Sequence, residues 1–311
     1  MIIKKKLLIT ISTILVMVIF NNHFCLVSIN FRPYSDSSFF RLMTYNTNGV
    51  AGDYKDDNFV DLFLHSIDSI SPQILVLQEM HREYSTTVCS ELQKRYSYNS
   101  LSQIASRKKS DRFAACLFSK YPIRSFYRYA FEKQELDSIY NECAIPDSIK
   151  RPFNADIYNA VLDIDSHETL VVCCYLKSNE YSKLRNEHND KWIDGLDDYL
   201  GAYNRGSTIR SLESKMIRDS IAKYSLPTIV CGDMNDFQCS PAVKTMMGDN
   251  MKNVWWERGL GYGMTYDKYH LKIRIDHILI SNEFEAERVD VPHLPFSDHY
   301  PIVADLRFIS K

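Results

Sequence analysis

The feature that most constrains the fold is a series of short apolar runs, each about as long as a β-strand, that alternate with segments of helical spacing. Strands are predicted at residues 39–46, 74–79, 113–119, 158–163, 169–176, 228–231, 274–281 and 302–309. Helices are predicted at residues 57–70, 83–95, 209–221 and 241–247. The alternation contains no nucleotide-binding glycine pattern and no repeat period, so it predicts one layered α/β domain over residues 39–311.

Three stretches between these elements are expected to be loops. Residues 124–156 carry two prolines and mixed charge, and are interpreted as an insertion or loop on the rim of a site. Residues 177–206 form a long polar connection, and residues 259–263, with Thr265 just after them, form a glycine-rich rim loop.

Composition allows a substantial core, because 45% of the 311 residues are apolar. The eight cysteines show no metal-type pairs, and four of them lie inside apolar runs, at Cys116, Cys173, Cys174 and Cys231. We expect these four to be buried single thiols. A disulfide among the scattered cysteines Cys89, Cys143 and Cys239 stays open.

Residues 1–30 are predicted to be a signal peptide or an N-terminal membrane anchor, followed by a linker at 31–38. Three lysines, at positions 4–6, precede 14 uncharged residues, Leu7 to Phe20, as in a secretory signal. Because no small-x-small cleavage site follows, an uncleaved anchor is slightly favoured. The lysines indicate that the N-terminus stays in the cytoplasm and the domain is exported, as a membrane-anchored, periplasmic or extracellular monomer. A leaderless cytoplasmic repair enzyme would instead require Leu7 to Phe20 to be core.

Net charge gives no sign of a nucleic-acid partner. The formal charge of −2 becomes −5 without residues 1–30, because that segment carries three lysines and no acid. A basic balance is the usual mark of a DNA-binding surface, so its absence weakens a DNA-binding interpretation without removing it.

Polar residues follow or end several predicted strands. The run that begins at Thr228 breaks at Gly232 into acids and an amide, a group suited to a hard divalent cation and a phosphoryl oxygen. The residues at such strand ends are Asn46, Glu79, Tyr175, Asp233, Asn235, Asp298 and His299, with Asp276 inside another strand. A single acid at a strand end is usually a solvated loop residue, so it is their joint occurrence that indicates a site.

Five ordered motifs resemble those of the endonuclease/exonuclease/phosphatase superfamily. They are Thr44-Tyr45-Asn46, Leu77-Gln78-Glu79, Gly232-Asp233-Met234-Asn235-Asp236, Arg274-Ile275-Asp276 and Ser297-Asp298-His299. The resemblance covers residues 39–309. It implies an α/β (α+β) four-layer sandwich of two packed, mainly antiparallel β-sheets flanked by helices, with the site at one end.

The resemblance also implies a metal-dependent hydrolase. By that likeness Glu79 is the principal Mg²⁺ ligand, with Asn46 beside it and Asp298 as a further metal-side acid, and Mn²⁺ is an alternative cation. This arrangement is physically reasonable, because one cation can neutralise phosphate oxygens.

The remaining motif residues are implied to act on water and phosphate. Asp233 would orient and deprotonate the attacking water, and Asn235 would hold the phosphate or that water. His299 would stabilise charge that develops on the phosphorane, with Asp276 fixing its ring.

One strand departs from the commoner family pattern. Cys174 and Tyr175 stand where the family usually has Asn and His in its Asn-His-Leu-Lys-Ser segment. Tyr175 is assigned to the site, although a phenol donates a proton less readily than imidazolium at neutral pH. Lys177 and Asn179, just after it, are candidate substrate contacts.

Several polar or aromatic residues are interpreted as structural. His277 is expected to face away from Asp276, into the core or surface. Asp236 is assigned a turn or hydrogen-bonding role and Met234 an interior one. The remaining structural assignments are the basic segment 107–112, expected to be a solvated loop, and the two tryptophans at 255 and 256, expected to pack in the core and rim.

These inferences predict an exported Mg²⁺-dependent phosphoesterase that hydrolyses a phosphodiester by attack of oriented water, endonuclease-like. Its partners would be a nucleic acid or a phospholipid or sugar phosphate, and a membrane through the N-terminal segment. The alternatives are a phospholipid, sphingomyelin or inositol-phosphate phosphoesterase and, in a different class, a catalytically degenerate binding module.

Overall fold

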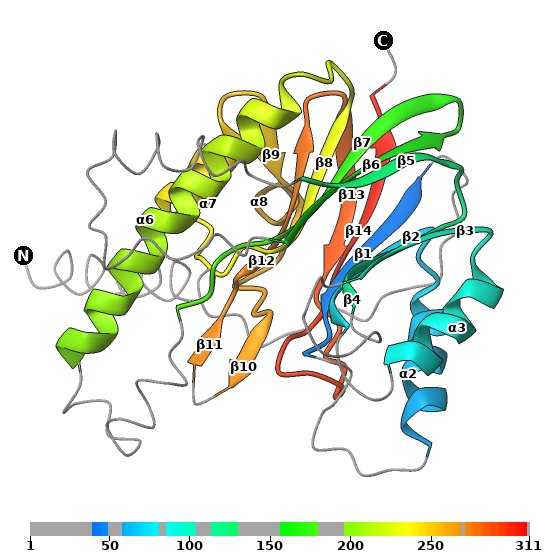
Figure 1. Ribbon diagram of the computed structural model, residues 1–311, viewed down its shortest axis with the longest axis horizontal. Helices are drawn as coiled ribbons and strands as arrows, with labels where there is room; N and C mark the ends of the chain where they lie inside the picture. The colour runs from blue at the N-terminus through cyan, green and yellow to red at the C-terminus, as the bar shows by residue number, and fades with distance from the viewer. Residues whose placement is uncertain are drawn as a thin grey trace, which may run out of the picture.

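A computed structural model describes residues 39–48, 58–80, 85–103, 113–129, 156–179, 196–268 and 271–309. Two β-sheets face each other at the centre of the molecule, and helices cover their outer faces (Figure 1). The predicted four-layer α/β sandwich is therefore confirmed.

The first sheet has the strand order β13-β14-β1-β2-β4-β3. Its strands are β1 (Phe40–Asn46), β2 (Ile74–Met80), β3 (Tyr98–Gln103), β4 (Phe113–Ser119), β13 (Phe284–Asp290) and β14 (Ile302–Phe308). Only β1 and β2 run parallel among these neighbours, with Asn46 in register with Gln78.

The second sheet has the order β5-β6-β7-β8-β12-β9. Its strands are β5 (Ile123–Tyr129), β6 (Asp156–Ile164), β7 (His167–Tyr175), β8 (Thr228–Asp233), β9 (Met251–Asn253) and β12 (Asp276–Ser281). Here β7 and β8 are the parallel pair, with Tyr175 in register with Asp233, and the other pairs are antiparallel.

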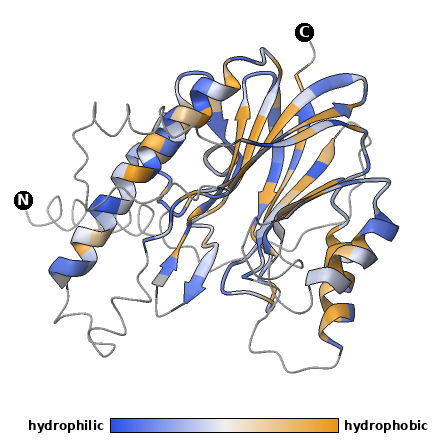
Figure 2. Ribbon diagram, viewed as in Figure 1, coloured by the Kyte–Doolittle hydropathy of each residue, from blue (hydrophilic) through white to orange (hydrophobic). Residues whose placement is uncertain are grey.

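Strand alternation separates three apolar layers. Successive residues of a strand face opposite sides, so Leu42 packs between the sheets while Met43 packs under the helices α2 (Phe59–Ile70) and α3 (Ser85–Arg95). On the far side, helices α6 (Leu196–Ile221) and α7 (Pro241–Met247) cover the second sheet. Figure 2 shows strands that are largely apolar and an α6 that alternates apolar and polar residues along its length.

The predicted buried thiols are confirmed, and no described pair is bonded. Cys116, Cys173, Cys174 and Cys231 are buried and free. Cys89 is free too, with its sulfur 3.6 Å from that of Cys116, and Cys239 is free and exposed. Cys143 lies outside the described residues.

The sequence-based elements are confirmed over most of the strands, but three assignments were wrong. Helix α6 begins at Leu196 rather than near residue 209, so it includes the end of the predicted polar connection 177–206. The prediction missed this start because the first turns of the helix are polar and contain two glycines, which lower helical propensity. Part of the predicted loop 124–156 is the strand β5, whose side chains are mostly exposed at the sheet edge. Strand β12 begins at Asp276, so Arg274 and Ile275 precede it. The strands β3, β9 and β13, the helix α8 (Val254–Arg258) and the hairpin of β10 (Tyr266–Lys268) and β11 (Leu271–Ile273) were not predicted.

The predicted N-terminal segments lie outside the described residues. Residues 1–38 are not among those described, and neither is the basic segment 107–112. Within the described residues, no helix has both the length and the apolar character needed to cross a bilayer.

Candidate active site

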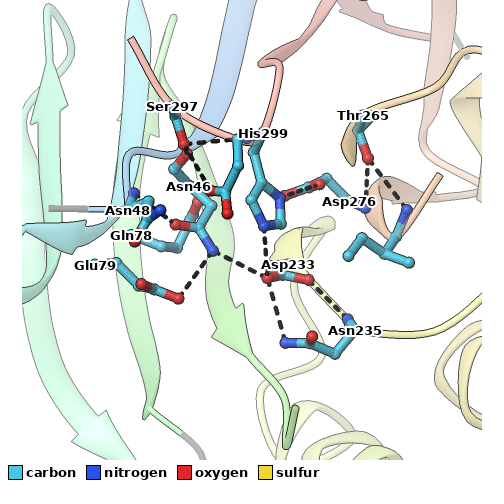
Figure 3. Close-up of polar contacts among 12 residues, drawn as sticks. Asn46, Asn48, Gln78, Glu79, Asp233, Asn235, Thr265, Asp276, Ser297 and His299 are labelled. Carbon is cyan, nitrogen blue, oxygen red and sulfur yellow. Dashed lines mark hydrogen bonds and ion pairs between the residues drawn. The ribbon is translucent and has the colours of Figure 1, made fainter. Parts of the chain in front are cut away.

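The predicted site residues gather where the parallel pairs of both sheets end. Asn46 ends β1, Glu79 lies near the end of β2, and Asp233 ends β8, while Asp276 begins β12 and His299 precedes β14 (Figure 3). These residues are up to 253 positions apart in the chain, from 46 to 299. The fold therefore joins the five motifs into one cluster at one end of the sandwich.

Asn46 links the two sheets. Its side-chain amide Nδ2 donates to Glu79 Oε1 at 3.1 Å and to Asp233 Oδ2 at 3.0 Å, while its Oδ1 accepts from the backbone N–H of Asn48. Because Asn46 and Asp233 are almost fully buried, these bonds hold the acid of one sheet against the strand end of the other.

Asp233 is held by Asn235 as well. Its Oδ1 accepts from the backbone N–H of Asn235 at 2.8 Å, and Oδ2 accepts from the Asn235 side chain at 3.2 Å. The same side chain donates to Leu176 O at 3.0 Å, the carbonyl just after β7. Asn235 and Glu79 both have positive φ, 51° and 55°, a conformation that costs energy for side chains other than glycine and is concentrated at functional sites.

His299 and Asp276 form a buried pair beside Asp233. His299 Nδ1 donates to Asp276 Oδ2 at 2.9 Å, and its Nε2 lies 3.8 Å from Asp233 Oδ2. Burial alone would lower the pKa of His299, but the nearby carboxylates of Asp276 and Asp233 outweigh it and raise the pKa to about 10. The imidazole is therefore a cation at neutral pH, with Nε2 directed toward Asp233.

The Asp233 carboxyl has a higher pKa than an ordinary surface acid. Burial and the charge of Asp276 raise its pKa to about 7, against the lowering effects of His299, Asn235 and Asn46. A group with a pKa near the working pH exchanges protons most effectively with a reactant. Asp233 therefore has the properties of a proton acceptor at neutral pH.

Thr265, which the sequence placed only in a rim loop, fixes Asp276. Its buried Oγ1 accepts from the backbone N–H groups of Ile275 and Asp276, each at 3.1 Å. Its carbonyl accepts from Tyr300 N at 2.6 Å, one residue after His299. Thr265 thus ties both members of the pair to one point, and no local sequence signal could have indicated these bonds.

Asp298 is placed beside a lysine. Its Oδ2 lies 2.6 Å from Nζ of Lys268, a residue that sequence reasoning did not single out. Burial would raise the pKa of Asp298, but the charges of His299 and Lys268 outweigh it and lower the pKa below the ordinary value.

Tyr175 ends β7, which neighbours β8 on the side opposite to β12. The two candidate substrate contacts, Lys177 and Asn179, follow it in the chain. Tyr175 is half-buried and in register with Asp233 on the neighbouring strand, so both occupy the same face of the sheet. The Asn179 carbonyl oxygen Oδ1 accepts from Arg210 at 2.8 Å, and the backbone of Lys177 bonds both Arg210 and Glu213. Asn179 is therefore directed toward α6 through that oxygen.

Arg210 and Glu213, one helical turn apart on α6, were missed because their partners lie far away in sequence. Both are fully buried. Arg210 Nε donates to Asp236 Oδ2 at 3.0 Å, so Asp236 has the hydrogen-bonding role predicted for it. Burial raises the pKa of Glu213 to about 7.

The residues that were interpreted as structural from the sequence lie in the core or on the rim. His277 is fully buried, donates from Nε2 to Asp236 O, and has a pKa lowered to about 4 by burial and then by Arg274. Met234 is buried. Trp255 packs in the core between the sheets, while Trp256 is 46% exposed and donates to Gln238 on the rim.

The donor set fits a hard divalent cation. Glu79 and Asp233 offer carboxylate oxygens, joined through the Asn46 Nδ2, and the Asn46 Oδ1, which accepts from Asn48 N, is an amide oxygen; these are the ligand types that Mg²⁺ and Mn²⁺ prefer. Ligand atoms of Asp233, Asp276 and His299 also lie within 4.8 Å of one another.

Comparisons with known proteins agree with this fold. The sequence model of the Endonuclease/Exonuclease/phosphatase family matches residues 43–299 of this chain. The fold is similar to that of the human Nocturnin catalytic domain with bound sulfate, at a TM-score of 0.62 and 15% identity, over 88% of this chain and 94% of that one. An endonuclease/exonuclease/phosphatase from Bacteroides vulgatus gives a TM-score of 0.61 and 15% identity, over 88% and 100% of the two chains. The D. rerio TDP2 humanized by 14 mutations gives a TM-score of 0.57 and 14% identity, over 87% and 100%. No curated protein sequence matches.

Proposed function

Because this chain belongs to the endonuclease/exonuclease/phosphatase family, whose members are hydrolases of phosphoester bonds, we propose that it cleaves a phosphodiester with the help of Mg²⁺. The observation that carries the proposal is the placement of Asp233 between the Asn46 amide and the Nε2 of His299. A proton acceptor, Asp233, and a cationic hydrogen-bond donor, His299, therefore lie next to each other.

Asp233 is the proton acceptor for the attacking water. With a pKa of about 7, it takes a proton from water more readily than an ordinary aspartate while staying largely ionised above neutrality. The backbone N–H of Asn235 holds Oδ1 of this carboxyl, while Oδ2 accepts from the side chains of Asn46 and Asn235 and lies 3.8 Å from His299 Nε2.

His299 stabilises negative charge on the phosphoryl group. Its Nδ1 is committed to Asp276, so Nε2 is the donor available to a non-bridging oxygen as charge grows there. Tyr175 is the proposed donor of a phenol proton to the leaving oxygen. Glu79 and Asn46 would hold Mg²⁺, which supplies neutralising charge to the phosphate when bound.

The substrate is proposed to be a nucleic acid, acted on as by an endonuclease. A phospholipid or inositol phosphate is the second candidate, favoured by exposed apolar side chains next to the catalytic loop. Phe237, two residues after Asn235, is 39% exposed and Trp256 is 46% exposed. A degenerate binding module is disfavoured, because each proposed chemical role has a residue in this site.

The experiment that tests the proposal assays the purified protein with Mg²⁺ on supercoiled plasmid, sphingomyelin and inositol phosphates. Nicking of the plasmid supports the nuclease, and an intact plasmid with a cleaved phospholipid rejects it in favour of the second candidate. Absence of metal-dependent hydrolysis across the panel contradicts a phosphodiesterase.

We further propose that the protein is exported and held at a membrane by residues 1–30 as a monomer. Fractionation of cells tests this, since recovery of the intact chain in the membrane fraction supports an anchor. A soluble intracellular protein contradicts it.

A further inference from the structure

A lysine forms an ion pair with the acid at the edge of the active site. Lys268 Nζ lies 2.6 Å from Asp298 Oδ2, and both side chains are partly buried, 34% and 15% exposed. Paired charges that are partly shielded from water attract one another more strongly than those of an exposed pair.

The backbone fixes this ion pair. Asp267 N donates to Asp298 O at 3.0 Å, and Tyr266 forms a β-bridge with His299. The Tyr266 ring also packs edge-on against the His299 ring, with centroids 4.9 Å apart. The β10 strand is thus paired along residues 298–300, and its last residue, Lys268, is brought to Asp298.

Asp298 is in turn joined to the first sheet. Ser297 Oγ donates to Asn46 O at 2.9 Å and accepts from His299 N at 3.1 Å. The acid therefore stands between the proposed cation ligands and the β10–β11 hairpin, where a second cation could otherwise bind.

We propose that Lys268 takes the place of a second divalent cation at Asp298, so that the chain binds one divalent cation, held by Glu79 and Asn46. The inference rests on the proposed metal-dependent function and deepens it. An ammonium group and a divalent ion repel one another on one carboxylate, and Lys268 already neutralises the charge that would attract the ion. Lys268 also supplies a positive charge that need not be captured from solution.

The test counts Mn²⁺ bound to the full chain by equilibrium dialysis and by its electron paramagnetic resonance signal. Wild-type protein is expected to bind one Mn²⁺, and Glu79→Gln to lose it. Lys268→Met is expected to bind a second Mn²⁺, which Lys268→Met combined with Asp298→Asn loses again. Lys272→Met is the matched control, because Lys272 lies on the same hairpin, is more exposed and pairs with Asp267 rather than Asp298; it is expected to bind one.

Asp298→Asn alone keeps the inference testable if Lys268→Met folds poorly. It is expected to leave Mn²⁺ affinity unchanged, whereas loss of a residue that orients a metal ligand lowers affinity about 10-fold to 100-fold. Two Mn²⁺ bound by the wild type, one Mn²⁺ bound by well-folded Lys268→Met, or a weakened first site in Asp298→Asn overturns the inference. Wild-type protein that binds no Mn²⁺ overturns the metal-dependent function itself, which separates the two failures.

Discussion

His299 Nδ1 donates to Asp276 Oδ2 at 2.9 Å, and this bond, buried from water, sets the charge state of the imidazole. Because Asp276 accepts from Nδ1, Nε2 is the ring nitrogen that can donate to a phosphoryl oxygen. The relationship also determines how activity should depend on pH.

The Asp276→Asn variant should lose activity at lower pH than the wild type does. The carboxylates of Asp276 and Asp233 overcome the effect of burial and raise the pKa of His299 to about 10, so the wild-type imidazolium persists across the neutral range. Removing the Asp276 charge lowers that pKa, and deprotonation of His299 then removes the donor as pH rises. The dependence of kcat/KM on pH between 6 and 10 measures this. An unchanged alkaline limb in Asp276→Asn would mean that His299 does not act as a cation.

Thr265→Val should reduce turnover through geometry. Valine has nearly the shape of threonine but cannot accept the two backbone N–H bonds now made to Oγ1. Each buried donor left without a partner costs about 1–3 kcal/mol, and a shift of Asp276 by about 1 Å can cost about 100-fold in rate. We expect lower kcat well below the melting temperature, with Thr265→Ser close to wild type. If Val lowered only thermal stability, Thr265 would be structural and would not position the pair.

Glu213 should make the protein less stable as pH rises from about 4.5 to about 7. Burial raises its pKa to about 7 in the fold from an ordinary 4.5. Between those values the folded state holds a proton that the unfolded state has released, so unfolding free energy falls with increasing pH, by up to about 3 kcal/mol at 1.4 kcal/mol per unit. Glu213→Gln should remove this part of the slope.

Urea unfolding at pH 5.5 and pH 8 measures that slope. Gln keeps an oxygen for the Lys177 N–H that Glu213 now binds. A variant that shows the same loss of stability as the wild type between the two pH values contradicts the assignment.

Arg210→Met should destabilise the fold strongly. It leaves Asp236, whose side chain is fully buried, without its cation, and removes bonds to Lys177 O and Asn179. Breaking one partner of a buried ion pair costs about 3–5 kcal/mol. The unfolding free energy of Arg210→Met, Asp236→Asn and the double variant forms a cycle, in which the double variant should be less destabilised than the sum. Simple additivity would show that the pair contributes no coupling.

The sequence revealed the catalytic cluster better than its supports. Asp233 and Glu79 stand at the ends of strongly apolar strands, and such a boundary is visible locally. Thr265, Lys268 and Arg210 act through partners 11, 30 and 26 positions away, in bonds that exist only once the hairpin and α6 are in place. The polar first turns of α6 and the short strands of the hairpin have weak periodicity, so neither the elements nor their contacts could be predicted from residue patterns.

The central claim is that Asp233 is the proton acceptor for the water that attacks a phosphodiester. The most direct measurement is the turnover of a phosphodiester by Asp233→Asn with Mg²⁺, compared with Asp267→Asn, a partly exposed acid on the neighbouring hairpin. Loss of a general base costs about 100-fold to 10,000-fold, so we predict a loss in that range for Asp233→Asn. Its melting temperature at pH 8 should be equal to or above that of the wild type, because burial disfavours the charged acid. Activity within tenfold of wild type in a folded Asp233→Asn protein would contradict the account.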